Sequence, residues 1–152
     1  MLPQKPKVAF YARCSTLQHE QNPQVQIDEL RRYSKARGWV VVEEVVDHGY
    51  SGSSDKRPGL NKLKRLVQGR SVDIVLVTKM DRLFRSTKHI VCTLSEWDEL
   101  GIQFVSLHDH IDATTSSGRL MMKRLSQFSV GFAGTAFLRS LLLGDFQFLL
   151  QV

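Results

Sequence analysis

The chain has 152 residues, 42% of them hydrophobic and 24% charged, and a formal net charge of +6. This length and apolar content suit one globular domain with one core. Cys14 and Cys92 give neither a disulfide framework nor a zinc-binding spacing, and residues 1–7 lack the apolar run of a signal peptide. A secreted, disulfide-rich protein is therefore disfavoured, and we expect a cytoplasmic location.

Predicted strands alternate with predicted helices along most of the chain. Apolar, β-branched segments predict strands at residues 7–12, 39–46, 72–78 and 102–107. A helix is predicted from the cap pair Asn22-Pro23 to Gly38, and two more at residues 60–68 and 87–100. Residues 47–58 are rich in turn formers and predict an irregular loop.

This alternation predicts an α/β fold, a three-layer sandwich with a mostly parallel central sheet. The run Val-Asp-Ile-Val-Leu-Val at residues 72–77 is typical of a strand buried on both faces, as in a parallel sheet. Ligands of such folds bind beyond the carboxyl ends of the strands. Ser15, Ser51 and Asp81 each follow a predicted strand, so we expect them at one edge of the sheet.

Positive charge is concentrated in residues 56–89, which contain ten Lys or Arg and only two acids, Asp73 and Asp81. This segment carries +8, so the remainder of the chain sums to −2. Such a basic surface attracts a polyanion, and nucleic acid is the commonest large one. The plainer alternative is an ordinary solvated helix face at residues 62–70.

Two motifs bring a hydroxyl and several guanidinium groups toward the expected edge. They are Tyr11-x-Arg13-x-Ser15 and Asp81-Arg82-x-x-Arg85. Serine is a poor nucleophile unaided, whereas arginines bind a phosphate and stabilise the charge that develops in its transition state. Phosphodiester chemistry on a nucleic acid is therefore the first hypothesis.

Six motifs occur in a fixed order: Tyr11-Ala-Arg13-Cys-Ser15-Thr16, Gln26 on the first helix, Asp47-x-Gly49-x-Ser51-Gly52, Arg57-Pro58-Gly59-Leu60, Lys79-Met-Asp81-Arg82-Leu83-x-Arg85-Ser86 and Gly118-Arg-Leu-Met121. Together they resemble the catalytic domain of the serine recombinases, the resolvase and invertase family of site-specific DNA recombinases. The resemblance covers residues 7 to about 124.

The resemblance implies that Ser15 attacks a DNA phosphate and that Arg13 clamps it. Around the same phosphate it places Ser51, Arg57, Asp81, Arg82 and Arg85, with Tyr11, Gln26 and Lys79 as further phosphate-binding residues. Attack by Ser15 would give a phosphoserine linkage and expel a sugar hydroxyl, which conserves a phosphoester bond for later reversal. The sequence has no Gly-x4-Gly-Lys-Ser/Thr loop, so we expect no nucleotide cofactor, and the serine mechanism requires no metal.

Each of these residues also has a plainer interpretation. Ser15 can cap the following segment, Tyr11 can pack in the core, and Gln26 can face solvent. Asp81-Arg82 can be only an ion pair at the start of a helix. Even within a phosphate site, Asp81 fits two roles, since it can accept a proton or orient Arg82 or Arg85.

Two other candidate sites are weaker. Cys14 invites comparison with cysteine phosphatases, but the arginine they need six residues later is Glu20 here. The segment His108-Asp109-His110-Ile-Asp112 contains metal-binding residue types, although so local a cluster is more often a polar loop. We assign neither a phosphatase loop nor a metal site.

The composition changes at Leu125, because residues 125–152 contain one base, Arg139, and one acid, Asp145. Sixteen of these 28 residues are apolar, but the charges interrupt them, so we expect no membrane anchor. We expect a catalytic domain at 1–124 and an atypical apolar tail at 125–152. This tail would replace the family's long dimerisation helix, and we expect the DNA-binding helix-turn-helix domain to be absent.

Two functional hypotheses follow. The first is a recombinase catalytic domain that cleaves and rejoins DNA through Ser15, for resolution, inversion or integration, with the family's dimer or tetramer in question. The second is a truncated or frameshifted, inactive remnant that binds DNA non-specifically or only self-associates.

Overall fold

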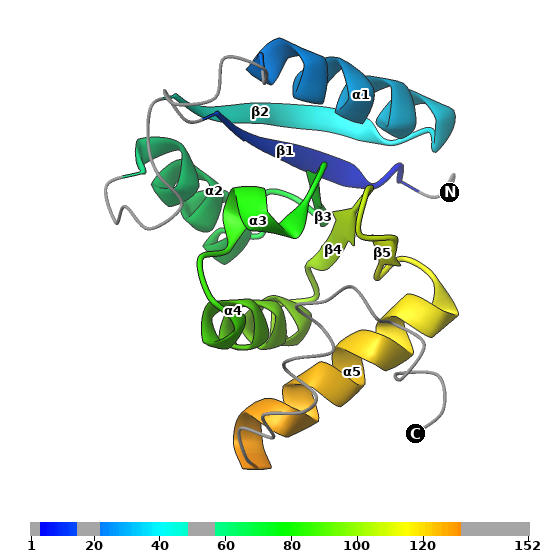
Figure 1. Cartoon of the computed structure of the whole chain (residues 1–152). Helices are drawn as coiled ribbons and strands as arrows, with labels where there is room; N and C mark the ends of the chain where they lie inside the picture. Colours follow the sequence, from blue (N-terminus) through cyan, green and yellow to red (C-terminus); the bar gives the residue numbers. More distant parts are fainter. Residues whose placement is uncertain (1–3, 15–21, 49–56, 132–152) are drawn as a thin grey trace.

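The computed structural model describes residues 4–14, 22–48 and 57–131 and consists of a central sheet with helices on both faces (Figure 1). The sheet has five strands in the order β2-β1-β3-β4-β5. Strands β1 to β4 pair in parallel, and β5 runs antiparallel to β4. The strands are β1 (Lys7–Cys14), β2 (Val40–His48), β3 (Ile74–Val77), β4 (Gln103–Ser106) and β5 (Ile111–Asp112). The predicted three-layer, mostly parallel α/β fold is confirmed.

The helices of the described residues are α1 (Pro23–Ala36), α2 (Pro58–Gln68), α3 (Met80–Leu83), α4 (Thr87–Glu99) and α5 (Ser116–Gly131). Three of these five helices, α1, α2 and α4, begin and end within about two residues of the predicted bounds, whereas α3 and α5 were not predicted. The Asn22 side chain accepts a hydrogen bond from the Gln24 N–H and so caps α1. Gly38 and Gly101 follow α1 and α4 with φ of +69° and +76°, a conformation that side chains with a Cβ disfavour.

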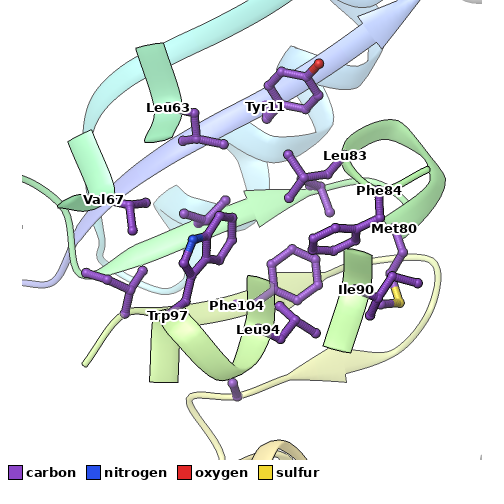
Figure 2. Close-up of a cluster of buried hydrophobic side chains, with 14 of the residues drawn as sticks. Tyr11, Leu63, Val67, Met80, Leu83, Phe84, Ile90, Leu94, Trp97 and Phe104 are labelled. Carbon is purple, nitrogen blue, oxygen red and sulfur yellow. The ribbon is translucent and has the colours of Figure 1, made fainter. Parts of the chain in front are cut away.

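The sheet separates two apolar cores. On one face, Val8, Phe10 and Ala12 of β1 pack with Ile27 and Leu30 of α1. On the other face lies the larger core, to which α2, α4 and α5 contribute (Figure 2). Figure 2 labels ten of its members: Tyr11, Leu63, Val67, Met80, Leu83, Phe84, Ile90, Leu94, Trp97 and Phe104. Because side chains alternate along a strand, Tyr11 belongs to this second core while its neighbours in sequence face α1.

Three features differ from the sequence-based expectation. Strands β1 and β2 pair to their ends, with Arg13 opposite Asp47, so Asp47 is a strand residue and not part of a loop. The single turn α3 was not predicted, because four residues carry no periodic signal. Helix α5 passes through residues 124 and 125, and Leu125 is buried in the larger core. The change in composition at Leu125 therefore does not coincide with an end of this helix.

Within the described residues, no helix has the length and apolar character needed to cross a membrane.

Candidate active site

A buried carboxylate, Asp47, joins the end of β2 to β1 and to the start of α2. Its oxygens accept hydrogen bonds from the Tyr11 hydroxyl at 2.8 Å, the Gly59 N–H at 2.7 Å and the Leu60 N–H at 3.0 Å. The residue at the N-cap of α2 is Arg57, whose side chain makes no capping bond. Asp47 therefore satisfies the first N–H groups of α2 from another element, and its negative charge favours the helix N-terminus.

Arg57 is only 2% exposed and contacts the Tyr11 hydroxyl, which donates to this carboxylate. Its Nη1 donates to the Leu83 carbonyl at 3.1 Å and lies 3.4 Å from the Arg82 carbonyl and 3.5 Å from the Tyr11 hydroxyl oxygen. The end of α3 thus accepts hydrogen bonds from a guanidinium group that Asp47 and Tyr11 help to place.

Arg13 and Arg82 bind to each other's backbone. Arg13 Nε donates to the Arg82 carbonyl at 3.3 Å, and Arg13 Nη2 donates to the Asp81 carbonyl at 3.2 Å. In return, Arg82 Nη1 lies 3.5 Å from the Arg13 carbonyl. Arg13, Arg57 and Arg82 therefore form one cluster of three cations. Backbone carbonyls accept hydrogen bonds from each guanidinium group and hold it in place.

The remaining charged residues of the second motif lie at the surface beside this cluster. Asp81 has an exposed side chain, and its Oδ1 pairs with Arg82 Nε at 3.3 Å. Both of its predicted roles, as a proton acceptor and as an orienting group, stay predictions. Lys79 and Arg85 are also exposed and lie just before and just after α3.

Gln26 is buried at 8% exposure rather than facing solvent. Its Nε2 donates to the Arg13 carbonyl at 3.1 Å, while its Oε1 is buried and has no hydrogen-bond partner among the described residues. Gln26 and Arg82 line a pocket of about 180 Å³, together with Asn22, Val25, Glu29, Thr78, Lys79 and His108. Three predicted residues, Gln26 of α1, Lys79 just before α3 and Arg82 of α3, therefore line one pocket.

Burial and like charge shift the pKa values in and around this cluster. Burial, and then the hydrogen bond to Asp47, raise the pKa of the Tyr11 phenol, which stays protonated at neutral pH. Burial, and then the charge of Arg82, lower the pKa of Arg13. The pKa of His89, on α4, is lowered by burial and then by the charges of Lys64, Arg57 and Arg85. A positive potential thus extends from the cluster toward α4, as an anion-binding site requires.

Two predicted residues, Ser15 and Ser51, lie outside the residues that the structure describes. In the sequence, Ser15 directly follows Cys14, the last residue of β1, and Arg13 lies two residues before it. Asp47, by contrast, was not predicted as a site residue, although it begins the quoted motif Asp47-x-Gly49-x-Ser51-Gly52. The signal available in the sequence was a carboxylate directly after a predicted strand and at the start of that motif.

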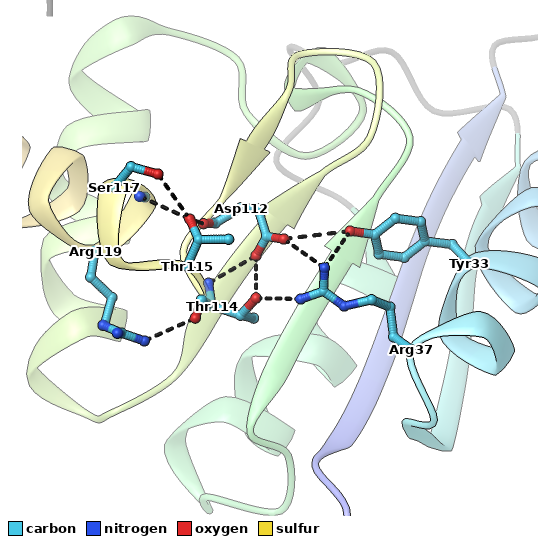
Figure 3. Close-up of polar contacts among 8 residues, drawn as sticks. Tyr33, Arg37, Asp112, Thr114, Thr115, Ser117 and Arg119 are labelled. Atoms are coloured by element: carbon cyan, nitrogen blue, oxygen red, sulfur yellow. Dashed lines mark hydrogen bonds and ion pairs between the residues drawn. The ribbon is translucent and has the colours of Figure 1, made fainter. Parts of the chain in front are cut away.

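The acidic and histidine-rich segment after β4 reaches three different partners. His108 Nε2 lies 2.8 Å from Glu29 Oε1, Asp109 contacts the start of α3, and Asp112 Oδ2 accepts from Arg37 Nη1 at 3.1 Å. Figure 3 shows Asp112 bound to Arg37 and Tyr33 of the α1 end and to Thr114. In the part of the chain that the structure describes, no three His, Cys, Asp or Glu side chains are grouped to hold a metal ion.

Fold and site together define a three-layer α/β domain with a cluster of arginines at the carboxyl edge of its parallel strands. Residues 8–130 match the family model described as resolvase, N-terminal domain. The chain is 35% identical to the N-terminal catalytic domain of TP901-1 integrase, with a TM-score of 0.71, over 80% of this chain and 92% of that one. The chain belongs to the resolvase family of serine recombinases, which confirms the family resemblance of its motifs.

Curated relatives agree with this assignment. The transposon Tn917 resolvase of Enterococcus faecalis is 32% identical over 119 residues, which cover 78% of this chain and 59% of that protein. The serine recombinase gin of Escherichia phage Mu is 44% identical over 78 residues, covering 51% of this chain and 39% of that protein. The chain thus spans less than two thirds of the length of these relatives.

Proposed function

We propose that this chain is the catalytic part of a site-specific DNA recombinase, which cleaves and rejoins DNA phosphodiesters through a covalent phosphoserine intermediate. The observation that carries the proposal is one cluster of three arginines, in which Arg13 and Arg57 donate to backbone carbonyls of α3 and Arg82, on α3, donates to the Arg13 carbonyl. The strand that supplies Arg13 ends at Cys14, and Ser15 is the next residue.

In the first step, the Ser15 hydroxyl oxygen attacks the phosphorus of a DNA phosphodiester. A bond forms between Oγ and phosphorus, and the bond from phosphorus to one sugar oxygen breaks. The hydroxyl loses its proton, and the departing sugar oxygen gains one. Because one phosphoester replaces another, the released sugar hydroxyl of an exchanged strand can reverse the reaction without an energy source.

The arginines supply the electrostatic part of the catalysis. A five-coordinate phosphorus carries more negative charge on its oxygens than the ground state does, and fixed guanidinium groups oppose that charge without reorganising. Arg13, Arg57 and Arg82 fill this role, with Arg85 and Lys79 at the exposed rim. Asp81 orients Arg82, and Tyr11 acts through Asp47 and Arg57. Gln26 and Ser51 are the neutral donors to phosphate oxygens.

The partner in this proposal is DNA in the cytoplasm, bound in part by the basic segment at residues 56–89. A synaptic dimer or tetramer would bring two DNA duplexes together for exchange. The chemistry uses no nucleotide cofactor, since the phosphoserine itself retains the bond energy.

Covalent capture tests the proposal. The probe is a pool of nicked duplexes that tile the DNA on both sides of the coding sequence, because a nick lets the cleaved strand diffuse away and traps the adduct. Wild-type protein should give a denaturant-resistant protein–DNA product, and Ser15→Ala none. Thr16→Ala serves as a matched hydroxyl control that should retain the product. Equal capture by wild type and Ser15→Ala would refute the assignment.

A further inference from the structure

The single turn α3 lacks a cap from its own neighbourhood. Its N-cap residue, Lys79, makes no side-chain capping bond. The N–H of Met80, the first residue of α3, instead donates to Asp109 Oδ2 at 2.6 Å, across 29 residues of sequence. The same oxygen accepts from the hydroxyl of Ser106, a residue at the end of β4 that is 1% exposed.

Asp109 is thereby connected to the arginine cluster through one turn of backbone. The carbonyls of Asp81 and Arg82, in that turn, accept from Arg13, and those of Arg82 and Leu83 accept from Arg57. A shift of α3 would therefore displace the acceptors of two guanidinium groups at once. One turn of helix has too few internal hydrogen bonds to hold its own position.

We propose that Asp109 is a positioning residue, which fixes α3 and through it the arginines that bind the scissile phosphate. The positioning role for catalysis rests on the recombinase function proposed above. In this proposal Asp109 acts on the phosphate-binding groups indirectly, through the hydrogen bond that it accepts from the Met80 N–H. The hydrogen bonds of Asp109 also give the polar segment after β4 a structural role that involves no metal ion.

The chemistry explains why a carboxylate suits this position. One oxygen accepts two hydrogen bonds, from a backbone N–H and from a hydroxyl, and a charged acceptor makes both of them stronger than a neutral one would. An asparagine side-chain oxygen can accept the same two bonds, although more weakly. Alanine accepts neither and leaves the Met80 N–H and the buried Ser106 hydroxyl without this acceptor.

The first arm of the test is independent of DNA. Hydrogen exchange of the Met80 N–H and of the Arg13 Nε–H is followed by NMR in wild type, Asp109→Ala and Asp109→Asn. Both protons should exchange on the order of tenfold faster in Asp109→Ala, and Asp109→Asn should restore most of the protection. Asp112→Ala is the matched control, because it removes a carboxylate from the neighbouring strand without a bond to α3, and it should leave both protons unchanged.

The second arm measures covalent capture and DNA affinity separately. Asp109→Ala should slow capture on the order of tenfold while the Kd for DNA changes less than about twofold, since a displaced α3 misaligns the phosphate without removing a charge from the cluster. Asp109→Asn should recover most of the rate. Ser106→Ala should slow capture less, and its effect should not add to that of Asp109→Ala, because both remove bonds to the same oxygen.

Unchanged Arg13 Nε–H exchange in Asp109→Ala, with faster Met80 exchange, would overturn the proposal, because the cap would then not reach the arginines. Equal losses in Asp109→Ala and Asp109→Asn would also overturn it. If the wild type forms no covalent product while the Arg13 proton responds to Asp109, the recombinase function fails and the structural coupling stands. The two failures are therefore distinguishable.

Discussion

Arg13 and Arg82 each donate a hydrogen bond to the other's backbone carbonyl, with distances of 3.3 Å and 3.5 Å. Two cations that lie close together repel, and each here is held by a neutral acceptor rather than by a carboxylate alone. The arrangement keeps positive charge at the edge of the sheet, where a phosphate can neutralise it.

Replacing Arg82 by lysine therefore tests whether a positive charge alone is sufficient or whether the planar guanidinium group is needed. Arg82→Lys keeps the cation but cannot bridge a carbonyl and a phosphate with a planar fork, so the rate of covalent capture should fall by about 10²-fold or more. Arg31→Lys is the control, because Arg31 of α1 makes an ion pair at the protein surface with Glu44 of β2. A rate for Arg82→Lys within a factor of two of wild type would show that charge alone suffices.

The Asp47 carboxylate is predicted to be a major determinant of stability. In Asp47→Asn, one oxygen becomes an NH₂ group that faces donors, so at least one bond from Tyr11, Gly59 or Leu60 is lost in a buried site. The free energy of unfolding should fall by about 2–4 kcal/mol in urea denaturation. Asp73→Asn, at the exposed end of the sheet, should change it by less than about 1 kcal/mol. Equal losses of stability in the two variants would contradict the prediction that Asp47 is a major determinant of stability.

Gly59 is predicted to tolerate no side chain. A Cβ at this position would lie 2.8 Å from both Asp47 Oδ1 and Val45 Cγ1, so Gly59→Ala must displace the carboxylate or the helix. We expect a loss of about 1–3 kcal/mol in the free energy of unfolding. Asn61→Ala, at an exposed position of the same helix, should be nearly neutral, and thermal unfolding of both variants checks the comparison.

The local signals in the sequence were sufficient for most of the fold. The Asn22 cap and the glycine that ends α1, Gly38, act within one or two turns of chain, and both were confirmed. The ends of β1 and β2 were each placed two residues short, because pairing between strands extends them over Arg13 and Asp47. Periodicity carries no information about such pairing.

The motifs identified which residues form the arginine cluster, but not how it is held. The Tyr11–Asp47 bond spans 36 residues and the Met80–Asp109 bond spans 29, and neither partner signals the other in sequence. Asp109 was considered as a metal ligand because of the histidines beside it. In the fold His108 contacts Glu29 and Asp112 contacts Arg37, and only such tertiary contacts separate these roles.

His89 should make stability depend on pH. Its Nδ1 is buried and has no hydrogen-bond partner in the part of the chain that the structure describes, and burial followed by nearby cations holds its pKa below the ordinary value of about 6.5. The unfolded chain therefore binds this proton more readily than the folded one. As pH falls below about 6.5, stability should decrease until the folded-state pKa is passed.

Urea denaturation of wild type and His89→Gln between pH 7.5 and 5.5 measures this contribution. The variant should lose less stability over the interval than the wild type does. His110→Asn is the control, because His110 is exposed and asparagine tolerates its φ of 54°. Identical pH dependence in wild type and His89→Gln would show that His89 does not contribute.

The most direct test of the central claim is to identify the residue that becomes attached to DNA. After covalent capture on the nicked duplex pool and nuclease digestion, mass spectrometry of proteolytic peptides should find the residual nucleotide on Ser15, and Ser15→Ala should yield no modified peptide. Attachment at another residue, or none in the wild type, would contradict the assignment of this chain as a serine recombinase catalytic domain that acts through Ser15.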